Sequence, residues 1–198
     1  MSQFRVADTG DVAVRYLDSG GDDLGAPVVF VPGFTDVADD YVEILPVFGR
    51  RIVVVELRGH GRSTAPAGPF DSDALARDVG AVVGAVTAGP VHLMTFSRGT
   101  TYALSWALAN RERVRSVSIG DYVPEEIELP DDVIFGLLAG RWRGTPVSDR
   151  DAAWARYRSL FPAAKLHEFV DSPHDIFRPE RGRYPSLVRE HVDAADAK

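Results

Sequence analysis

Residues 91–100 read VHLMTFSRGT, an apolar strand-like stretch that leads directly into Ser97 and is followed by a helical pattern. Small residues, Thr95 and Gly99, stand two positions before and two positions after this serine. A chain that turns so sharply from strand to helix strains the serine backbone, and bulky residues at those two positions would collide. The turn would hold the hydroxyl out from the sheet edge, beside the free N–H groups of the helix start. Ser97 is therefore the candidate nucleophile.

Short apolar runs alternate with helical patterns along the rest of the chain. This alternation predicts an α/β fold with a mostly parallel central sheet flanked by helices, opened by an antiparallel pair of strands. The expected strands are residues 3–7, 12–18, 27–31, 51–56, 91–96, 114–119, 132–140 and 165–170. The expected helices are residues 71–87, 97–110, about 148–160 and 185–194.

Composition narrows the class of protein. The 198 residues are 45% hydrophobic and 26% charged, which predicts one ordinary globular domain spanning 1–198. A net charge of -7 argues against a nucleic-acid partner and against docking on anionic membranes. The absence of cysteine excludes disulfides and thiolate chemistry. We see no signal peptide and no apolar run of membrane-spanning length, so we expect a cytoplasmic protein without membrane insertion.

Two further motifs carry a resemblance to a known family. Residues 31–35, VPGFT, resemble the oxyanion loop of the α/β-hydrolase superfamily, usually written H-G-F/W, with Pro32 where histidine is common. Residues 56–63, ELRGHGRS, resemble its D-x-R-G-x-G-x-S signature, with Glu56 in place of aspartate. Together with the strand–Ser97–helix pattern, these motifs make the chain similar to α/β-hydrolases over nearly its whole length. We expect Glu56 to brace the turn that follows it rather than to react.

The resemblance implies a catalytic base after the last strand. Residues 171–175, DSPHD, occupy that position, so His174 is the expected base that activates Ser97. The other histidines are better explained by packing, turn structure or solvation: His60, His92, His167 and His191.

The acid of the expected triad is displaced. The superfamily usually places it after the penultimate strand, but residues 139–144, AGRWRG, offer arginines and no carboxylate. The superfamily also has an alternative position after the preceding strand, which Asp121 occupies. Asp121 would orient His174 and stabilise its cation. Asp149 is the alternative acid, although it is better placed to cap a helix.

The resemblance also implies an oxyanion hole and a pocket around it. The donors would be the backbone N–H groups of Phe34 and Arg98, and the Phe34 ring either walls the acyl pocket or simply packs. Four residues could give the mouth of the pocket a positive rim, or could instead form a solvated or internally paired set: Arg98, Arg141, Trp142 and Arg143. The chain also has an acidic cluster whose spacing matches no metal-binding loop: Asp36, Asp39 and Asp40. It is better explained as the solvated start of a helix.

Most members of the superfamily carry a helical cap after the strand that here ends at Ile119. Barely a dozen residues separate Gly120 from the next expected strand, so we expect the cap to be absent or minimal. Ser97 should then lie in an open groove, unless a second copy closes it in a homodimer through apolar residues near 133–142.

The expectation from sequence is a cap-less serine hydrolase acting on an ester or thioester of a small-molecule or carrier-tethered acyl group. It would use Ser97, His174 and Asp121 and require no cofactor or metal. A serine at the turn argues against epoxide hydrolases and haloalkane dehalogenases, which use aspartate there. Two alternatives stay open: a non-hydrolytic enzyme of a biosynthetic pathway (acyl transfer, cyclisation or C–C cleavage), and a non-catalytic binding scaffold.

Overall fold

The structure is a computed structural model, and only part of the chain is described. The described residues are 2–21, 25–65, 67–122, the main chain of 135–141, 151–152, 155, 158–159, 162–169, 172, 174–177 and 182–198.

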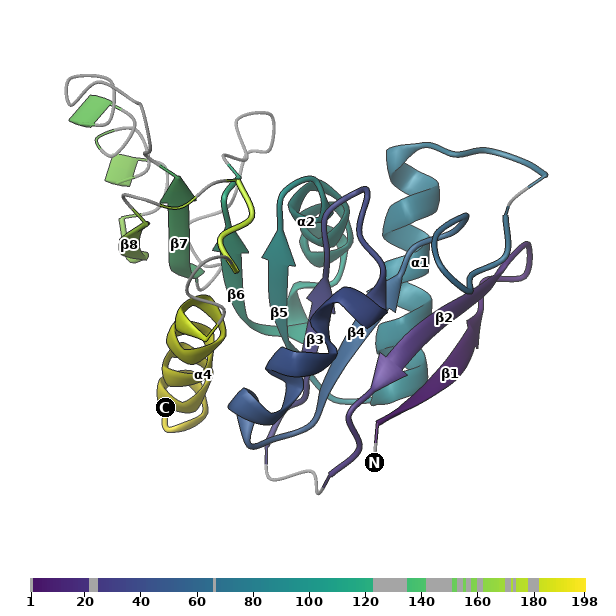
Figure 1. Ribbon diagram of the computed structural model, residues 1–198, viewed down its shortest axis with the longest axis horizontal. Coiled ribbons are helices and arrows are strands. Elements are labelled where there is room, and N and C mark those ends of the chain that lie inside the picture. The colour runs from purple at the N-terminus through teal and green to yellow at the C-terminus, as the bar shows by residue number, and fades with distance from the viewer. Residues whose placement is uncertain are drawn as a thin grey trace.

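The described chain forms a sheet of eight strands in the order β1-β2-β4-β3-β5-β6-β7-β8 (Figure 1). The pairs β1–β2 and β2–β4 are antiparallel, and every pair from β4–β3 onward is parallel. The expected fold class, α/β with a mostly parallel sheet, is confirmed. The strands are β1 Gln3–Asp8, β2 Ala13–Asp18, β3 Val28–Val31, β4 Ile52–Glu56, β5 Val91–Phe96, β6 Val114–Gly120, β7 Phe135–Arg141 and β8 Lys165–Phe169.

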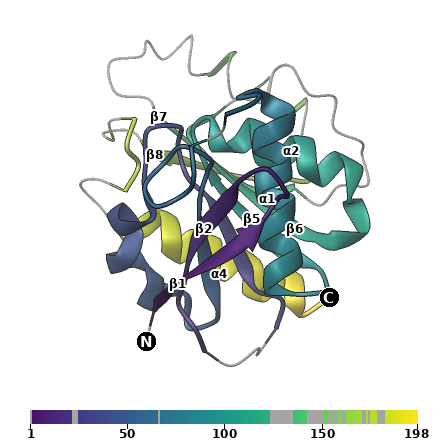
Figure 2. The same ribbon diagram turned by 90° about the vertical axis from the view of Figure 1, so that its right-hand side faces the viewer.

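Helices cover both faces of this sheet, so its central strands are apolar on both sides. α1 Ser72–Val86 and α2 Gly99–Ala109 pack on one face, whereas the 3-10 helix η1 Ala38–Phe48 and α4 Arg183–Asp196 pack on the other (Figures 1 and 2). Strand β3 shows the alternation: Val29 and Val31 join the core under α1 and α2, and Phe30 joins the core under η1 and α4.

Some expected bounds need correction. The strand expected at 132–140 begins at Phe135 as β7, and residues 132–134 lie outside the described part. Of the helix expected near 148–160, only positions 151, 152, 155, 158 and 159 are described, and they are helical. The acidic cluster led us to expect only the start of a helix, whereas the structure has an eleven-residue 3-10 helix there, η1. The carboxyl-terminal helix begins two residues earlier than expected.

The connection from β6 to β7 is residues 121–134, which is too short for a separate cap domain. The cap of this α/β fold is therefore minimal. Only the first two residues of that connection are described, so the shape of the remainder lies outside the structure.

Helix α4 carries two buried polar side chains, and one of them bonds to the sheet. Tyr184 is fully buried, and its hydroxyl donates to the carbonyl of Thr95 at 2.8 Å, next to the strand-to-helix turn at Ser97. His191, also on α4, is 8% exposed. Burial lowers the pKa of His191 to about 4.

We expect acid to weaken the folded state through this histidine. The unfolded chain binds a proton at His191 below about pH 6.5, whereas the folded chain stays neutral there until about pH 4. The free energy of unfolding should therefore fall as the pH drops through that window. Urea titrations at several pH values would measure it. In His191→Gln, which has no titrating group at this position, the free energy of unfolding should depend less steeply on pH. Some slope remains in the variant because burial also lowers the pKa of His92. An unchanged slope in the variant would refute the assignment.

Candidate active site

The strand-to-helix turn has the geometry that its sequence predicts. Ser97 follows β5 with a φ of 49°, which is left-handed for a residue with a side chain, and its N–H donates to the carbonyl of Gly120 at 2.9 Å. A Cβ at Gly99 would lie 2.1 Å from the carbonyl oxygen of Pro32. Thr95 fits the other side because its buried hydroxyl bonds to that of Thr100 at 2.8 Å. The turn is therefore packed directly against the loop after β3.

Gly99→Ala should destabilise the protein, because its methyl group would collide with rigid backbone rather than with a movable side chain. We expect a loss of about 3 kcal/mol in the free energy of unfolding, measured by urea denaturation. Gly84→Ala is the matched control: Gly84 lies in α1 with nothing within 4 Å of its added Cβ. It should gain roughly 0.5–1 kcal/mol. Equal stability of the two variants would show that the turn can relax.

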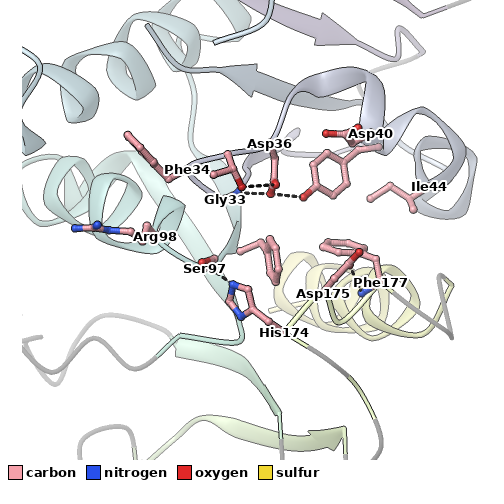
Figure 3. Close-up of a pocket in the computed structure, with 13 residues that line it drawn as sticks. Gly33, Phe34, Asp36, Asp40, Ile44, Ser97, Arg98, His174, Asp175 and Phe177 are labelled. Atoms are coloured by element: carbon pink, nitrogen blue, oxygen red, sulfur yellow. Dashed lines mark hydrogen bonds between the residues drawn. The ribbon is translucent and has the colours of Figure 1, made fainter. Parts of the chain in front are cut away.

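Three residues from separate strand ends meet at this turn. The Nε2 atom of His174 lies 2.9 Å from the Ser97 hydroxyl oxygen, and its Nδ1 atom is hydrogen-bonded to the Asp121 carboxylate (Figure 3 shows the Ser97–His174 bond). A carboxylate accepts only, so Nδ1 carries the proton and Nε2 is left to accept from Ser97. The structure thus brings together the nucleophile, base and acid expected from sequence. Asp149, the alternative acid, lies outside the described residues.

Burial differs along this chain of hydrogen bonds. The Asp121 side chain is 13% exposed, whereas that of His174 is half exposed. The Phe96 ring stacks on the imidazole with centroids 5.1 Å apart, which holds the plane of the ring. Asp121 itself has a φ of 46°, so a second residue with a side chain occupies the left-handed region at this site. Two strained backbones at one place are typical of a functional site.

Phe34, Ser97 and Arg98 line the same pocket. Arg98 immediately precedes α2, whose free N–H groups favour negative charge. Within the part of the chain that the structure describes, neither the Phe34 amide nor the Arg98 amide donates to a protein acceptor. The neighbouring amide of Gly33 is instead taken by the Asp36 carboxylate at 2.9 Å. The two expected donors therefore have no protein acceptor in the described part of the chain.

The loop that carries Phe34 is held by the glycine-rich turn of residues 57–63. His60 places Nε2 against the Phe34 carbonyl and Nδ1 2.9 Å from the Arg58 carbonyl, and whichever ring nitrogen carries the proton donates to its carbonyl. The Phe34 ring both lines the pocket and packs edge-on against His60, so the two interpretations of this ring are compatible. Glu56 accepts from the amide of Arg62 at 2.7 Å, and so it braces the turn.

Ser97 opens on a cavity of about 800 Å³ between η1 and the segment after β8 (Figure 3). Sequence reasoning missed most of its wall, which comes from apolar and acidic side chains on these two segments and at the end of β5: Asp40, Tyr41, Ile44, Phe96, Asp175 and Phe177. One signal for part of it was available. Apolar residues recur at positions 41, 44, 45 and 48, which is the spacing of a buried helical face.

Several expectations about the surroundings fall partly outside the structure. Arg98 lines the cavity, but the side chains of Arg141, Trp142 and Arg143 are not among the described ones, nor is the surface expected to join two copies. The acidic cluster is divided: Asp39 pairs with Arg62 at 2.7 Å, whereas Asp36 accepts from the Tyr41 hydroxyl. No group of three His, Asp or Glu side chains suited to a metal occurs among the described residues. In the same part of the chain, no helix is long and apolar enough to cross a bilayer.

Comparison with known proteins assigns the family. A family model described as alpha/beta hydrolase fold matches residues 26–149, so the chain belongs to the α/β hydrolase fold family. A non-heme chloroperoxidase of Streptomyces lividans is 36% identical over 168 residues, which cover 83% of this chain and 56% of the chloroperoxidase. The chain therefore spans little more than half the length of this curated relative.

Solved structures agree on the fold. A thermophilic esterase from Thermogutta terrifontis superposes with a TM-score of 0.77 at 15% identity, covering 98% of this chain and 99% of the esterase. A CIB-like hydrolase from Thermoplasma acidophilum superposes with a TM-score of 0.75 at 16% identity, covering 100% and 99% of the two chains. At such identities the likeness concerns the fold alone.

Proposed function

We propose that this protein is a serine hydrolase that cleaves an ester or thioester through an acyl-enzyme. The observation that carries the proposal is the continuous chain of hydrogen bonds from Asp121 through His174 to Ser97, at the mouth of a cavity large enough for an acyl group. Membership of the α/β hydrolase fold family supports it.

Each group has a role in the proposed reaction. His174 Nε2 takes the proton as the Ser97 oxygen attacks the carbonyl, and Asp121 stabilises the imidazolium that forms. The amides of Phe34 and Arg98 donate to the oxyanion of the tetrahedral intermediate. His174 returns the proton to the departing alcohol or thiol. A water molecule then repeats the sequence on the acyl-enzyme and releases the acid.

Exposure of the base bears on the substrate. Because the His174 side chain is half exposed, the leaving group can extend into solvent, which suits either a small ester or an acyl group tethered to a carrier. The acyl group itself would enter the cavity beside η1. A wet, half-exposed base forgoes part of the benefit of water exclusion, so small activated esters should turn over slowly.

A fluorophosphonate probe tests the proposal most directly. We expect it to label the intact protein once, and peptide mass spectrometry should place the label on Ser97. Release of nitrophenol from a nitrophenyl ester should be blocked in the labelled protein. A protein that neither reacts with the probe nor hydrolyses the ester would instead be a binding scaffold.

The chloroperoxidase relative favours one further assay. Its name and its 36% identity make peroxide-dependent halide oxidation a second candidate activity. Chlorination of a dione reporter in the presence of peroxide, acetate and chloride would reveal it. Loss of that activity in the fluorophosphonate-labelled protein would place both activities at Ser97.

A further inference from the structure

The turn that carries Phe34 is closed twice by the same residue, Asp36. Residues 33–36 form a β-turn in which the Asp36 amide donates to the Gly33 carbonyl at 3.2 Å. The Gly33 amide in turn donates to the Asp36 carboxylate at 2.9 Å (Figure 3). The main-chain bond is at the long end of the usual range, and the carboxylate adds a shorter bond across the same turn.

The carboxylate lies close against the glycine of this turn. A Cβ at position 33 would be 2.6 Å from the Asp36 Oδ2 atom. A larger residue at position 33 would therefore displace the carboxylate. The glycine of the VPGFT stretch and the aspartate three positions later are thus parts of one arrangement.

Tyr41 fixes the carboxylate from its other side. The Tyr41 hydroxyl donates at 2.7 Å to the Asp36 oxygen that also accepts from the Gly33 amide. The tyrosine is only 6% exposed, and its ring packs edge-on against Phe30 and Phe177, with centroids 4.7 and 5.0 Å away. Burial raises the pKa of Tyr41 far above its usual value, and the charge of Asp36 raises it further, so the hydroxyl remains a donor at physiological pH.

This turn decides the direction of the Phe34 amide. In a planar trans peptide the N–H and C=O groups point in opposite directions. The Gly33 carbonyl is directed into the turn, towards the Asp36 amide, so the Phe34 N–H of the same peptide is directed out of it. The next carbonyl, that of Phe34, contacts Nε2 of His60. Both peptides that flank Phe34 are therefore fixed, and its amide has no protein acceptor in the described part of the chain.

We propose that Asp36, held by Tyr41, is a positioning residue that fixes the Gly33–Phe34 peptide, so that the Phe34 N–H is in place for the oxyanion before the reaction begins. The inference rests on the proposed hydrolase function, in which this amide stabilises the tetrahedral intermediate. A donor that is already in place costs no reorganisation when charge develops. The charge of Asp36 would itself oppose the oxyanion, so its benefit comes from the oxygen that accepts the two hydrogen bonds.

Two substitutions of Asp36 separate the accepting oxygen from the charge. Alanine removes the acceptor, whereas the single amide oxygen of asparagine can accept from both Gly33 and Tyr41, which reach one oxygen in the wild type. We expect Asp36→Ala to lower kcat for a nitrophenyl ester by about 100-fold. KM should change little, because the amide acts on charge that develops after the substrate has bound. Asp36→Asn should keep kcat within about threefold of the wild type.

Asp39→Ala is the matched control. Asp39 lies three positions further along the chain, is paired with Arg62 at 2.7 Å and does not line the cavity beside Ser97. Deleting its carboxylate should leave kcat unaltered. Urea unfolding curves of all variants would show whether each is folded under the conditions of the assay.

A transition-state analogue gives a measurement that a purely structural role of Asp36 would not change. A trifluoromethyl ketone adds to Ser97, and the resulting hemiketal carries an oxyanion like that of the tetrahedral intermediate. We expect Asp36→Ala to raise its inhibition constant by about 100-fold, in parallel with the loss of kcat/KM. Asp36→Asn and Asp39→Ala should bind it as the wild type does.

The outcomes separate the inference from the proposed function. Wild-type kcat in Asp36→Ala, or an equal loss in the alanine and asparagine variants, would overturn the inference and leave the hydrolase intact. If Asp36→Ala does not fold, Tyr41→Phe decides, because it deletes only the hydroxyl and keeps the packed ring. It should lower kcat by about 10-fold, and an unchanged kcat would overturn the inference. A wild-type protein that cleaves no ester would instead refute the proposed function, and the inference with it.

Discussion

Replacing Ser97 by alanine should lower kcat for ester hydrolysis by about 10,000-fold or more, with little change in the folded state. In the proposed mechanism His174 activates the Ser97 hydroxyl, which lies 2.9 Å from its Nε2, and alanine offers nothing to attack the carbonyl. The backbone strain at Ser97 persists in this variant because alanine also has a Cβ. Steady-state kinetics with a nitrophenyl ester, beside a urea unfolding curve, would measure both quantities.

Ser186→Ala is the matched control for that experiment. Ser186 is exposed on α4, so the same chemical change there should leave kcat unaltered. Wild-type-like activity in Ser97→Ala would refute the triad mechanism outright. Loss of activity together with loss of folding would instead show that the variant cannot report on chemistry, and fluorophosphonate labelling of the wild type would then decide.

Asp121→Asn should lower kcat by about 10,000-fold while KM changes little. An asparagine can donate to Nδ1, which would drive the proton to Nε2 and leave His174 unable to accept from Ser97. The side chain of Asp121 is only 13% exposed, so water cannot easily substitute for the lost carboxylate. Kinetics of the purified variant, with circular dichroism as a check on folding, would measure the effect.

Asp149→Asn is the comparison that makes this experiment decisive. Asp149 follows the loop in which the family usually places its acid. We expect Asp149→Asn to lower kcat far less than Asp121→Asn does. If the two losses were reversed, the acid of this enzyme would belong after β7 and the hydrogen bond of Asp121 to His174 would be structural.

Much of the site was predictable because its parts are local or lie at one edge of a parallel sheet. The strand-to-helix turn shows in the local sequence as Ser97 with small residues two positions before and after it. The structure adds the reason for Gly99, because the backbone of the distant Pro32 lies 2.1 Å from where its Cβ would be. Strands in a parallel sheet end at the same edge, so residues that follow β5, β6 and β8 were expected at that edge, although β8 is not adjacent to β5 or β6. Ser97, Asp121 and His174 stand at those three positions.

Other features were out of reach of such reasoning. The carboxylate of Asp36 binds Gly33 and Tyr41, whereas that of Asp39 binds Arg62, although the two residues are close in sequence and identical in type. Nothing in the local pattern distinguishes them. The difference depends on where η1 is placed against the glycine-rich turn.

The sequence by itself determined the fold class, the sharp turn at Ser97 and the order of the three candidate site residues along the chain, because periodicity and the pattern of a tight turn act over a few residues. Only the tertiary structure decided what surrounds the nucleophile. Tyr41 on η1 and Phe177 after β8 pack ring to ring with centroids 5.0 Å apart, from segments more than a hundred positions apart in the chain. The wall of the cavity, and the charge it presents, arise when η1 and the segment after β8 pack together on the same face of the sheet.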